Sequence, residues 1–418
     1  MAGGDDAAPP RPTLTFDPQV EPPQPPPSEA EEPPEPDDRP TGRLATGITE
    51  RNASLLFATG ARQVDPGLEP WRARLEQLRP AYYRLSIDWS QLQPSPGRPA
   101  NLAKLDDGCA RGVAPCGAYR GIRDQLRAVA SQQRAHGGWE VLVVLYGVPD
   151  WAARPAGGCE RPDIGPRSRP ITAEGMRGYR RLVRDVAALG EAEGVPLRYW
   201  SPWNEPNQQF FVSPQRDVCV TDAPSRAAGV YTGFVRALRD ELPRARLVLG
   251  EMAGVDGPTP RATGIAELVR ALPRDVACAA AVWSQHAYAE RSAVAAGLEG
   301  PVGQLERALD RRPCTRRARI WVTETGVGGA RAGAERDVSG GALRAGCRAL
   351  HRQLRRWHRH PRIDAAFQYT FREDLAFPVG LADVSLTRTY PTFDLWKAWG
   401  GDNRSPGDPP PSIQACSP

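Results

Sequence analysis

Two glutamates follow short apolar segments, and their surroundings suggest acid–base chemistry. Glu205 lies in a Trp-Asn-Glu-Pro stretch at 203–206, and Glu324 lies in an Ile-Trp-Val-Thr-Glu-Thr-Gly stretch at 320–326. Each stretch reads as the end of a buried strand that delivers one glutamate into a loop. Hydrolysis of a glycosidic bond requires two such carboxyl groups, one to protonate the leaving oxygen and one to attack or to activate water. The two glutamates are therefore the first candidates for catalysis.

The segments that must position these glutamates alternate between strand-like and helix-like patterns. Strands are expected at 44–48, 81–87, 140–146, 197–203, 246–249, 279–286, 319–323 and 363–370. Helices are expected at 68–78, 119–136, 177–189, 225–241, 264–272, 302–311, 341–358 and 390–399. This alternation predicts an α/β protein with a (β/α)8 TIM barrel. An open doubly wound sheet is the alternative, but its Gly-x-Gly-x-x-Gly signature does not follow the first strand.

The two ends of the chain differ in composition from the part between them. Residues 1–40 are Pro-rich and carry a net charge of −8, so we expect a disordered acidic tail there. The catalytic barrel would occupy 41–401, and 402–418 would form a C-terminal tail. Residues beyond 40 carry a net charge of +13, but their arginines are scattered, so no nucleic-acid partner is expected. No apolar run is long enough for a transmembrane segment.

Several motifs in this strand order resemble those of the clan A glycoside hydrolases, and families 39 and 5, with their xylosidases and cellulases, look most similar. Besides the two glutamate stretches, the chain has Tyr-Arg-Leu at 83–85, Gly-Val-Pro-Asp-Trp at 147–151 and His-Ala-Tyr at 286–288. The resemblance covers most of residues 44–400. It implies a retaining glycosidase that cleaves O-glycosidic bonds, with Glu205 as the acid/base and Glu324 as the nucleophile.

The resemblance also implies supporting residues around the two carboxyl groups. Arg84 would pair with Glu324 and Tyr288 would donate a hydrogen bond to it, which keeps a nucleophile ionised. Asn204 would bond the sugar 2-hydroxyl, and His286 would line the cleft near the acid/base. Simpler interpretations remain open. Arg84 would then form an ordinary buried ion pair, Tyr288 would be a core tyrosine and His286 a hydrogen-bonded core histidine. Glu205 would lie at a helix N-terminus, and Glu324 in an exposed loop.

Aromatic residues near the expected strand ends are candidates for sugar contacts. Trp89 and Trp151 follow strand ends, where indole rings stack on pyranose faces, but either residue also fits a hydrophobic core. Asp150 would bond a sugar hydroxyl or cap the next turn. Families of this kind usually place a tryptophan at the end of the eighth strand. Here Tyr369 or Phe371 would take its place, which leaves the substrate open.

The same resemblance implies no metal ion and no organic cofactor. The expected partner is an oligosaccharide, polysaccharide or glycoside substrate, and we expect a monomer. A third carboxyl group, that of Glu251, follows the expected fifth strand. It is expected near the mouth of the barrel, either in contact with sugar or simply at the surface.

Eight cysteines without Cys-x-x-Cys spacing favour disulfides, and hence an oxidising compartment, over a zinc site. Scattered buried thiols are the alternative. On the implied barrel, neighbouring cysteines are Cys109 and Cys116, Cys159 and Cys219, Cys278 and Cys314, and Cys347 and Cys416. This arrangement is one of 105 possible pairings. We expect a secreted or cell-surface protein, although no signal-peptide pattern is visible in the sequence.

Two other functions remain open at this point. One is a catalytically inactive barrel that binds carbohydrate, and the other is a transglycosylase that passes the sugar to an acceptor. The presence of both glutamates together with Arg84, Asn204 and Tyr288 favours an enzyme over the inactive barrel. Hydrolysis and transfer use the same carboxyl groups, so the sequence does not separate them. It also leaves open the sugar, the linkage and endo or exo action.

Overall fold

A computed structural model describes residues 44–58, 65–255, 257–329, 335–400 and 411–417 of the chain. All of them belong to one compact unit, Asp38–Pro418. The expected acidic tail at 1–40 lies outside the described residues, as do 402–410 and 418 of the expected C-terminal tail. Within the described part, no helix is long and apolar enough to cross a membrane.

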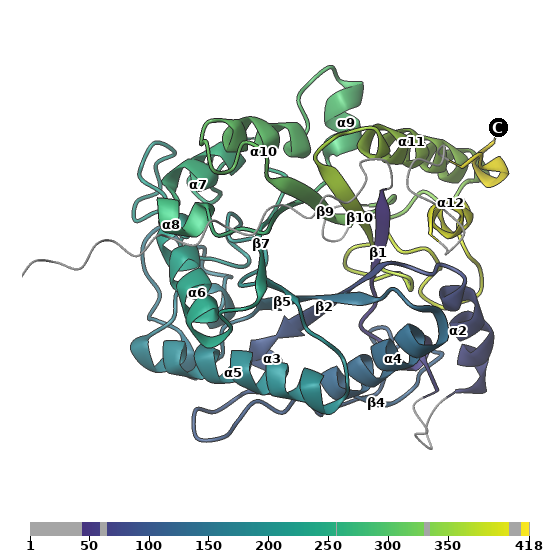
Figure 1. Cartoon of the computed structure of the whole chain (residues 1–418), viewed down its shortest axis with the longest axis horizontal. Coiled ribbons are helices and arrows are strands. Elements are labelled where there is room, and N and C mark those ends of the chain that lie inside the picture. The colour runs from purple at the N-terminus through teal and green to yellow at the C-terminus, as the bar shows by residue number, and fades with distance from the viewer. Residues whose placement is uncertain (1–43, 59–64, 256, 330–334, 401–410, 418) are drawn as a thin grey trace, which may run out of the picture. The chain divides into compact units, whose positions relative to one another are not determined.

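Eight parallel strands close into a barrel, as the sequence predicted (Figure 1). In chain order they are β1 (Ala45–Thr49), β2 (Tyr82–Asp88), β5 (Glu140–Tyr146), β6 (Tyr199–Ser201), β7 (Arg246–Met252), β8 (Val282–His286), β9 (Arg319–Thr325) and β10 (Ile363–Tyr369). Each strand pairs with its neighbours in the chain, and β1 closes the barrel by pairing with both β2 and β10. All eight strands therefore end at the same face.

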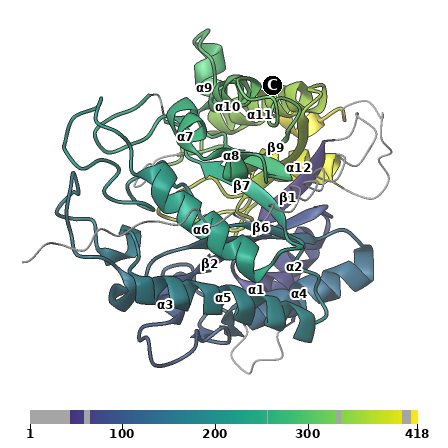
Figure 2. The ribbon, with the colours of Figure 1, turned by 60° about the vertical axis from the view of Figure 1, so that its left-hand side comes forward.

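Helices surround the barrel, and α5 and α6 lie next to each other on its outside (Figure 2). The longer helices are α2 (Glu69–Glu76), α4 (Gly121–His136), α5 (Ala173–Ala192), α6 (Ala227–Glu241), α7 (Ile265–Ala271), α10 (Pro301–Asp310), α11 (Gly340–His358) and α12 (Pro391–Trp399). Short elements are α1 (Ala53–Leu56), α3 (Trp89–Leu92), α8 (Arg274–Ala277), α9 (Glu290–Ala295), β3 (Leu105–Asp106) and β4 (Tyr119–Arg120). Single 3₁₀ turns are η1 (Pro66–Leu68), η2 (Asp150–Ala152), η3 (Pro166–Ser168) and η4 (Gln414–Cys416).

The barrel interior is filled by side chains rather than open. Tyr82, Tyr199 and Trp321 meet there, with ring centroids 4.6–6.0 Å apart. Phe367 adds a fourth ring, and Gly47 leaves room for it, because a Cβ at that position would lie 2.2 Å from the phenyl ring. A packed interior of this kind makes the strand ends a rigid platform.

The expected elements occur close to their predicted bounds, with differences that matter at the strand ends. β6 is shorter than predicted and stops at Ser201, so the loop that carries Glu205 begins early. β7 and β9 are longer than predicted, so Glu251 and Glu324 lie inside strands rather than after them. The start of the predicted helix at 119 instead pairs as β4 with β3.

All four neighbouring cysteine pairs form disulfides. They are Cys109–Cys116, Cys159–Cys219, Cys278–Cys314 and Cys347–Cys416. The second bridge joins the loop after β5 to the loop after β6, which carries Glu205. The last one fastens η4 to α11. The sequence-based pairing is therefore confirmed.

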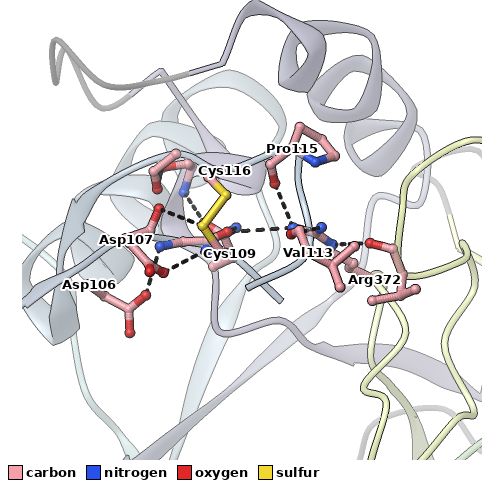
Figure 3. The surroundings of a disulfide bond; sticks show 12 residues. Asp106, Asp107, Cys109, Val113, Pro115, Cys116 and Arg372 are labelled. Atoms are coloured by element: carbon pink, nitrogen blue, oxygen red, sulfur yellow. Dashed lines mark hydrogen bonds between the residues drawn. A yellow bond between two sulfur atoms is a disulfide. The ribbon is translucent and has the colours of Figure 1, made fainter. Parts of the chain in front are cut away.

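One buried arginine, which follows the last strand of the barrel, holds the Cys109–Cys116 loop in place (Figure 3). The Arg372 guanidinium, just after β10, donates to the carbonyl oxygens of Val113 and Pro115, each at 2.8 Å. Its backbone N–H donates to the Glu50 carboxylate at 3.0 Å. The loops after β1, β2 and β10 are thereby held together at the face where the strands end.

Replacing Cys159 and Cys219 together by serine should lower the free energy of unfolding by about 4 kcal/mol, because the bridge closes a chain segment with a sequence separation of 60. The same change at Cys109 and Cys116, with a separation of 7, should cost only about 2 kcal/mol. Urea unfolding followed by tryptophan fluorescence measures both losses. Equal losses would show that loop closure does not set the contribution of these bridges.

Candidate active site

Glu205 and Glu324 converge at the carboxyl end of the barrel although 119 positions separate them in the chain. One oxygen of each carboxyl group and one nitrogen of His286 all lie within 4.8 Å of one another. The Glu205 side chain is 18% exposed and that of Glu324 is 11% exposed. Both carboxyl groups are therefore largely shielded from water yet accessible from the mouth of the barrel.

Arg84 occupies the centre of the site and contacts three of its residues. From β2, its Nη1 pairs with Glu324 at 2.7 Å, and its Nη2 donates to Asn204 Oδ1 at 2.7 Å and to Glu251 Oε2 at 2.6 Å. Burial alone would lower the pKa of Arg84, but the charges of Glu251 and Glu324 raise it, so the side chain stays cationic. The predicted pairing of Arg84 with Glu324 is present.

His286, the last residue of β8, lies between the carboxyl groups. Its Nδ1 is 2.7 Å from Glu205 Oε1 and 3.5 Å from Glu324 Oε2, and its Nε2 is 3.3 Å from Glu251 Oε2. Burial alone would lower the pKa of His286. The charge of Glu324 and the hydrogen bonds to Glu205 and Glu251 outweigh burial and raise the pKa to about 10. The charges and contacts around the imidazole therefore favour its protonated form.

Tyr288 donates its hydroxyl to Glu324 Oε2 at 2.9 Å. Burial, followed by the charge of Glu324, raises the pKa of this phenol well above its usual value, so it remains a donor. Phe377, from the segment between β10 and α12, packs edge-on against Tyr288 and Tyr369, with ring centroids 4.7 and 5.9 Å apart. Nothing in the sequence pointed to Phe377, because it lies in a long irregular segment.

Glu251 is fully buried, which the sequence did not reveal. Burial would raise its pKa, but the charge of Arg84 and the hydrogen bond from His286 hold it well below its usual value, so the carboxyl group is ionised. The surface interpretation of Glu251 is wrong, and with no exposed area it cannot touch sugar directly. Charge pairing explains its burial, since an unpaired buried carboxylate is costly.

Two of the aromatic candidates belong to the core instead of the cleft. Trp89 is fully buried and packs edge-on against Trp151, with ring centroids 5.6 Å apart. Phe371 is also fully buried and packs against Trp71 at 6.2 Å. Both predictions of sugar contact are therefore corrected. Trp89 also contacts Tyr179 of α5, and Phe371 contacts Phe393 of α12, so both rings pack against the surrounding helices.

The remaining candidates are accessible to different extents. Trp151 is half-buried and donates its Nε1–H to the carbonyl of Gln93 at 2.8 Å, and Asp150 beside it is exposed. Tyr369 is half-buried at the end of β10, where the resemblance called for a tryptophan. Asn204 is 6% exposed beside Arg84. Because guanidinium groups only donate, the amide oxygen must face Arg84, which directs the amide nitrogen elsewhere.

Glu205, His286 and Glu324 are residue types that also bind divalent metals. Here, however, the histidine faces carboxylates with both ring nitrogens, and a guanidinium already pairs with Glu324. A metal-binding imidazole would have to be neutral and offer a free lone pair. The cluster therefore fits acid–base chemistry better than metal binding.

Comparison with known proteins gives a likeness of fold. The sequence matches no protein-family model and no curated protein. A conserved exported protein from Bacteroides fragilis has a TM-score of 0.55 and 12% identity, over 90% of this chain and 83% of that one. A family 39 β-xylosidase from Caulobacter crescentus has a TM-score of 0.53 and 14% identity, over 86% of this chain and 72% of that one. A family 30 endoxylanase from Clostridium papyrosolvens has a TM-score of 0.51 and 12% identity, over 88% of this chain and 74% of that one. The chain thus shares the barrel fold of these three proteins, two of which are glycoside hydrolases.

The protonation of His286 predicts how stability depends on pH. A histidine whose pKa rises from 6.5 to about 10 on folding stabilises the protein fully below pH 6.5 and loses that contribution as pH rises through 10. The free energy of unfolding should therefore fall across this interval, and His286→Gln should flatten the fall. Urea midpoints at pH 6, 8 and 10 measure it. His136→Gln at the end of α4 is the control and should keep the wild-type slope, whereas an unchanged slope in His286→Gln would refute the assignment.

Proposed function

We propose that the protein is a retaining glycoside hydrolase that uses Glu205 as acid/base and Glu324 as nucleophile. The observation that supports this best is the approach of the two carboxyl groups, whose nearest oxygens lie within 4.8 Å. Retaining enzymes keep the two carboxyl groups about 5–5.5 Å apart, whereas inverting enzymes need about 6.5–9.5 Å to fit a water molecule between carboxylate and sugar. The shorter spacing favours direct attack by one carboxylate.

The surroundings of Glu324 suit a nucleophile. One of its oxygens pairs with Arg84 at 2.7 Å, and the other accepts the Tyr288 hydroxyl at 2.9 Å. Both contacts stabilise the ionised form, and each weakens when the oxygen becomes part of an ester. The carboxylate is thus held in place to attack the anomeric carbon and is released readily in the second step.

Glu205 would carry the proton in both steps. In the first, its carboxyl proton passes to the leaving oxygen as the bond between that oxygen and the anomeric carbon breaks and the bond to Glu324 forms. In the second, the Glu205 carboxylate takes a proton from water while the water oxygen displaces Glu324 from the sugar. Glu205 is then protonated and Glu324 ionised again, so the cycle closes without another reagent.

Contacts to the sugar are proposed from residues that remain accessible. Asn204, with its oxygen turned to Arg84, would donate its amide nitrogen to the 2-hydroxyl, a bond that strengthens as the oxocarbenium-like state develops. Tyr369 and Phe377 would form the apolar wall of the first subsite, in place of a tryptophan. Trp151 and Asp150 lie after β5 and would serve a more distant subsite.

We also propose that the enzyme works outside the cytoplasm. Eight cysteines form four disulfides, which persist in oxidising compartments and are rare in the cytosol. A carbohydrate polymer or a glycoside outside the cell is then the natural substrate. The Bacteroides fragilis protein of similar fold is itself described as exported.

Glu205→Gln and Glu324→Gln should both lose activity, but in ways that differ with the leaving group. Loss of an acid matters little when the leaving group needs no proton, so Glu205→Gln should retain activity on 2,4-dinitrophenyl glycosides. On substrates with alcohol leaving groups its kcat should fall by about 10²–10⁴-fold. Glu324→Gln should lose activity on both, because attack itself is removed. The kcat of each variant on a panel of aryl and alkyl glycosides measures these losses. Proton NMR of the first product gives its anomeric configuration.

Glu193→Gln, at a carboxyl group that pairs with Arg127 on the outer face of the barrel, is the matched control and should behave like wild type. Inversion of configuration would rule out the retaining mechanism. Full activity in both Glu205→Gln and Glu324→Gln would remove the assignment altogether. Oligosaccharide binding without turnover of any glycoside would instead favour a barrel that only binds carbohydrate.

A further inference from the structure

Glu251 is a buried carboxylate that the two catalytic steps do not use. Its Oε2 accepts Nη2 and Nε of Arg84 at 2.6 and 3.0 Å and faces His286 Nε2 at 3.3 Å. One oxygen thus contacts both cations of the site. Because the side chain has no exposed surface, its carboxylate can act on the reacting groups through the two cations that it contacts, Arg84 and His286.

The backbone is distorted at the point that delivers this carboxylate. Leu249 pairs with Trp283 and Met252 with Gln285, so β7 contains one extra residue relative to β8. Gly250 and Glu251 both have positive φ, 113° and 48°, which is unusual for a glutamate. Such β-bulges often lie beside active sites and redirect a side chain. At Gly250 a Cβ would lie 2.3 Å from the Ser284 carbonyl oxygen, so only glycine fits.

Several hydrogen bonds keep the bulge in this form. The Gly250 N–H donates to the Tyr231 hydroxyl at 2.9 Å, and the Glu251 N–H donates to Ser284 Oγ at 2.7 Å. The carbonyl of Glu251 accepts the backbone N–H of Glu205 at 2.8 Å, and Glu205 too has a positive φ, 38°. The strained backbones of the buried carboxylate and of the proposed acid/base thus support each other.

The contact of Glu251 with His286 fixes the proton on the imidazole. An ionised carboxylate only accepts hydrogen bonds, so Nε2 must carry a hydrogen. Nδ1 then faces Glu205 Oε1 at 2.7 Å with one proton between the two groups. That proton belongs either to Glu205, beside a neutral imidazole, or to Nδ1, beside a carboxylate. A fixed negative charge at Nε2 favours the protonated imidazole.

We propose that Glu251 is a positioning residue that orients Arg84 and His286 and holds a proton on the Glu205–His286 pair. The proposal rests on the retaining mechanism proposed above. Moving the proton breaks the Nδ1–H bond and forms the O–H bond of Glu205, and the neutral imidazole that remains still donates Nε2–H to Glu251. The ionisable groups that face this cluster are Arg84 from β2, Glu205 after β6, Tyr231 from α6, Tyr288 after β8 and Glu324 from β9.

Glu251→Gln in the full chain tests the proposal, because glutamine keeps the size of the side chain and removes its charge. Loss of that charge should weaken proton binding by the pair, so the alkaline limb of kcat/KM against pH should move to lower pH by at least one unit. At neutral pH kcat should fall at least tenfold, while KM changes less than threefold, since substrate does not touch Glu251. An aryl glycoside that wild type hydrolyses is the probe.

Glu50→Gln is the matched control, because Glu50 is also a buried carboxylate at a strand end and accepts the backbone N–H groups of Arg372 and Asn52, each at 3.0 Å. It should lower stability and leave the pH profile unchanged. If Glu251→Gln shows the wild-type pH profile, or loses activity only in proportion to its folded fraction, the role is merely structural and the proposal fails. Glu251→Asp, which keeps the charge, should restore much of the alkaline limb.

Proton NMR of histidine tests the same idea without a measurement of catalysis. The chain has five histidines, and His286→Gln identifies the resonance of His286. In wild type that resonance should titrate well above pH 6.5, whereas titration at the ordinary value would overturn the proposal. A chain that hydrolyses no glycoside but shows the raised titration would refute the proposed function and leave the role of Glu251 intact.

Discussion

The site depends on one constraint, that charges buried at the barrel mouth must be paired. Three carboxylates and two cations meet there, and Arg84 is in contact with two of the carboxylates while His286 faces all three. An unpaired charge in such surroundings would cost several kcal/mol. Each cation contacts at least two carboxylates, and Glu251 and Glu324 each contact both cations, so the members of the cluster hold one another in place.

Such a cluster needs a support that fixes several side chains independently, and the closed barrel provides it. β2, β7, β8 and β9 each contribute one charged residue, and Glu205 follows β6. Parallel strands end at one face, which is why residues 84 and 324 meet there. The positive φ values at Glu205 and Glu251 show where regular strand geometry gives way. At these two residues the backbone adopts a conformation that glutamate rarely takes, and this places both side chains in the site.

The sequence predicted the parts of this arrangement that follow from strand order. Glu205, Glu324, Arg84, His286 and Tyr288 could be proposed because the motifs that carry them resemble those of glycoside hydrolases and occur in the expected strand order. Trp89 and Phe371 were misplaced because both follow strand ends, where strand order does not determine which way a side chain of the next short helix or loop points. Glu251 was missed because one inserted residue in β7 turns it inward, and no hydrophobic pattern reveals a bulge.

Phe377 and Tyr369, the proposed wall of the first subsite, connect the proposed nucleophile to loops at the mouth of the barrel. Phe377 packs against Tyr288, the partner of Glu324, and against Tyr369, which ends β10. The segment that carries Phe377 begins beside Arg372, which in turn holds the Cys109–Cys116 loop. The Cys109–Cys116 loop is thus linked through Arg372 to the segment that carries Phe377. Under the proposed function, the fold separates the chemistry, which depends on buried charges on strands, from sugar recognition, which depends on loops joined by one arginine and a disulfide.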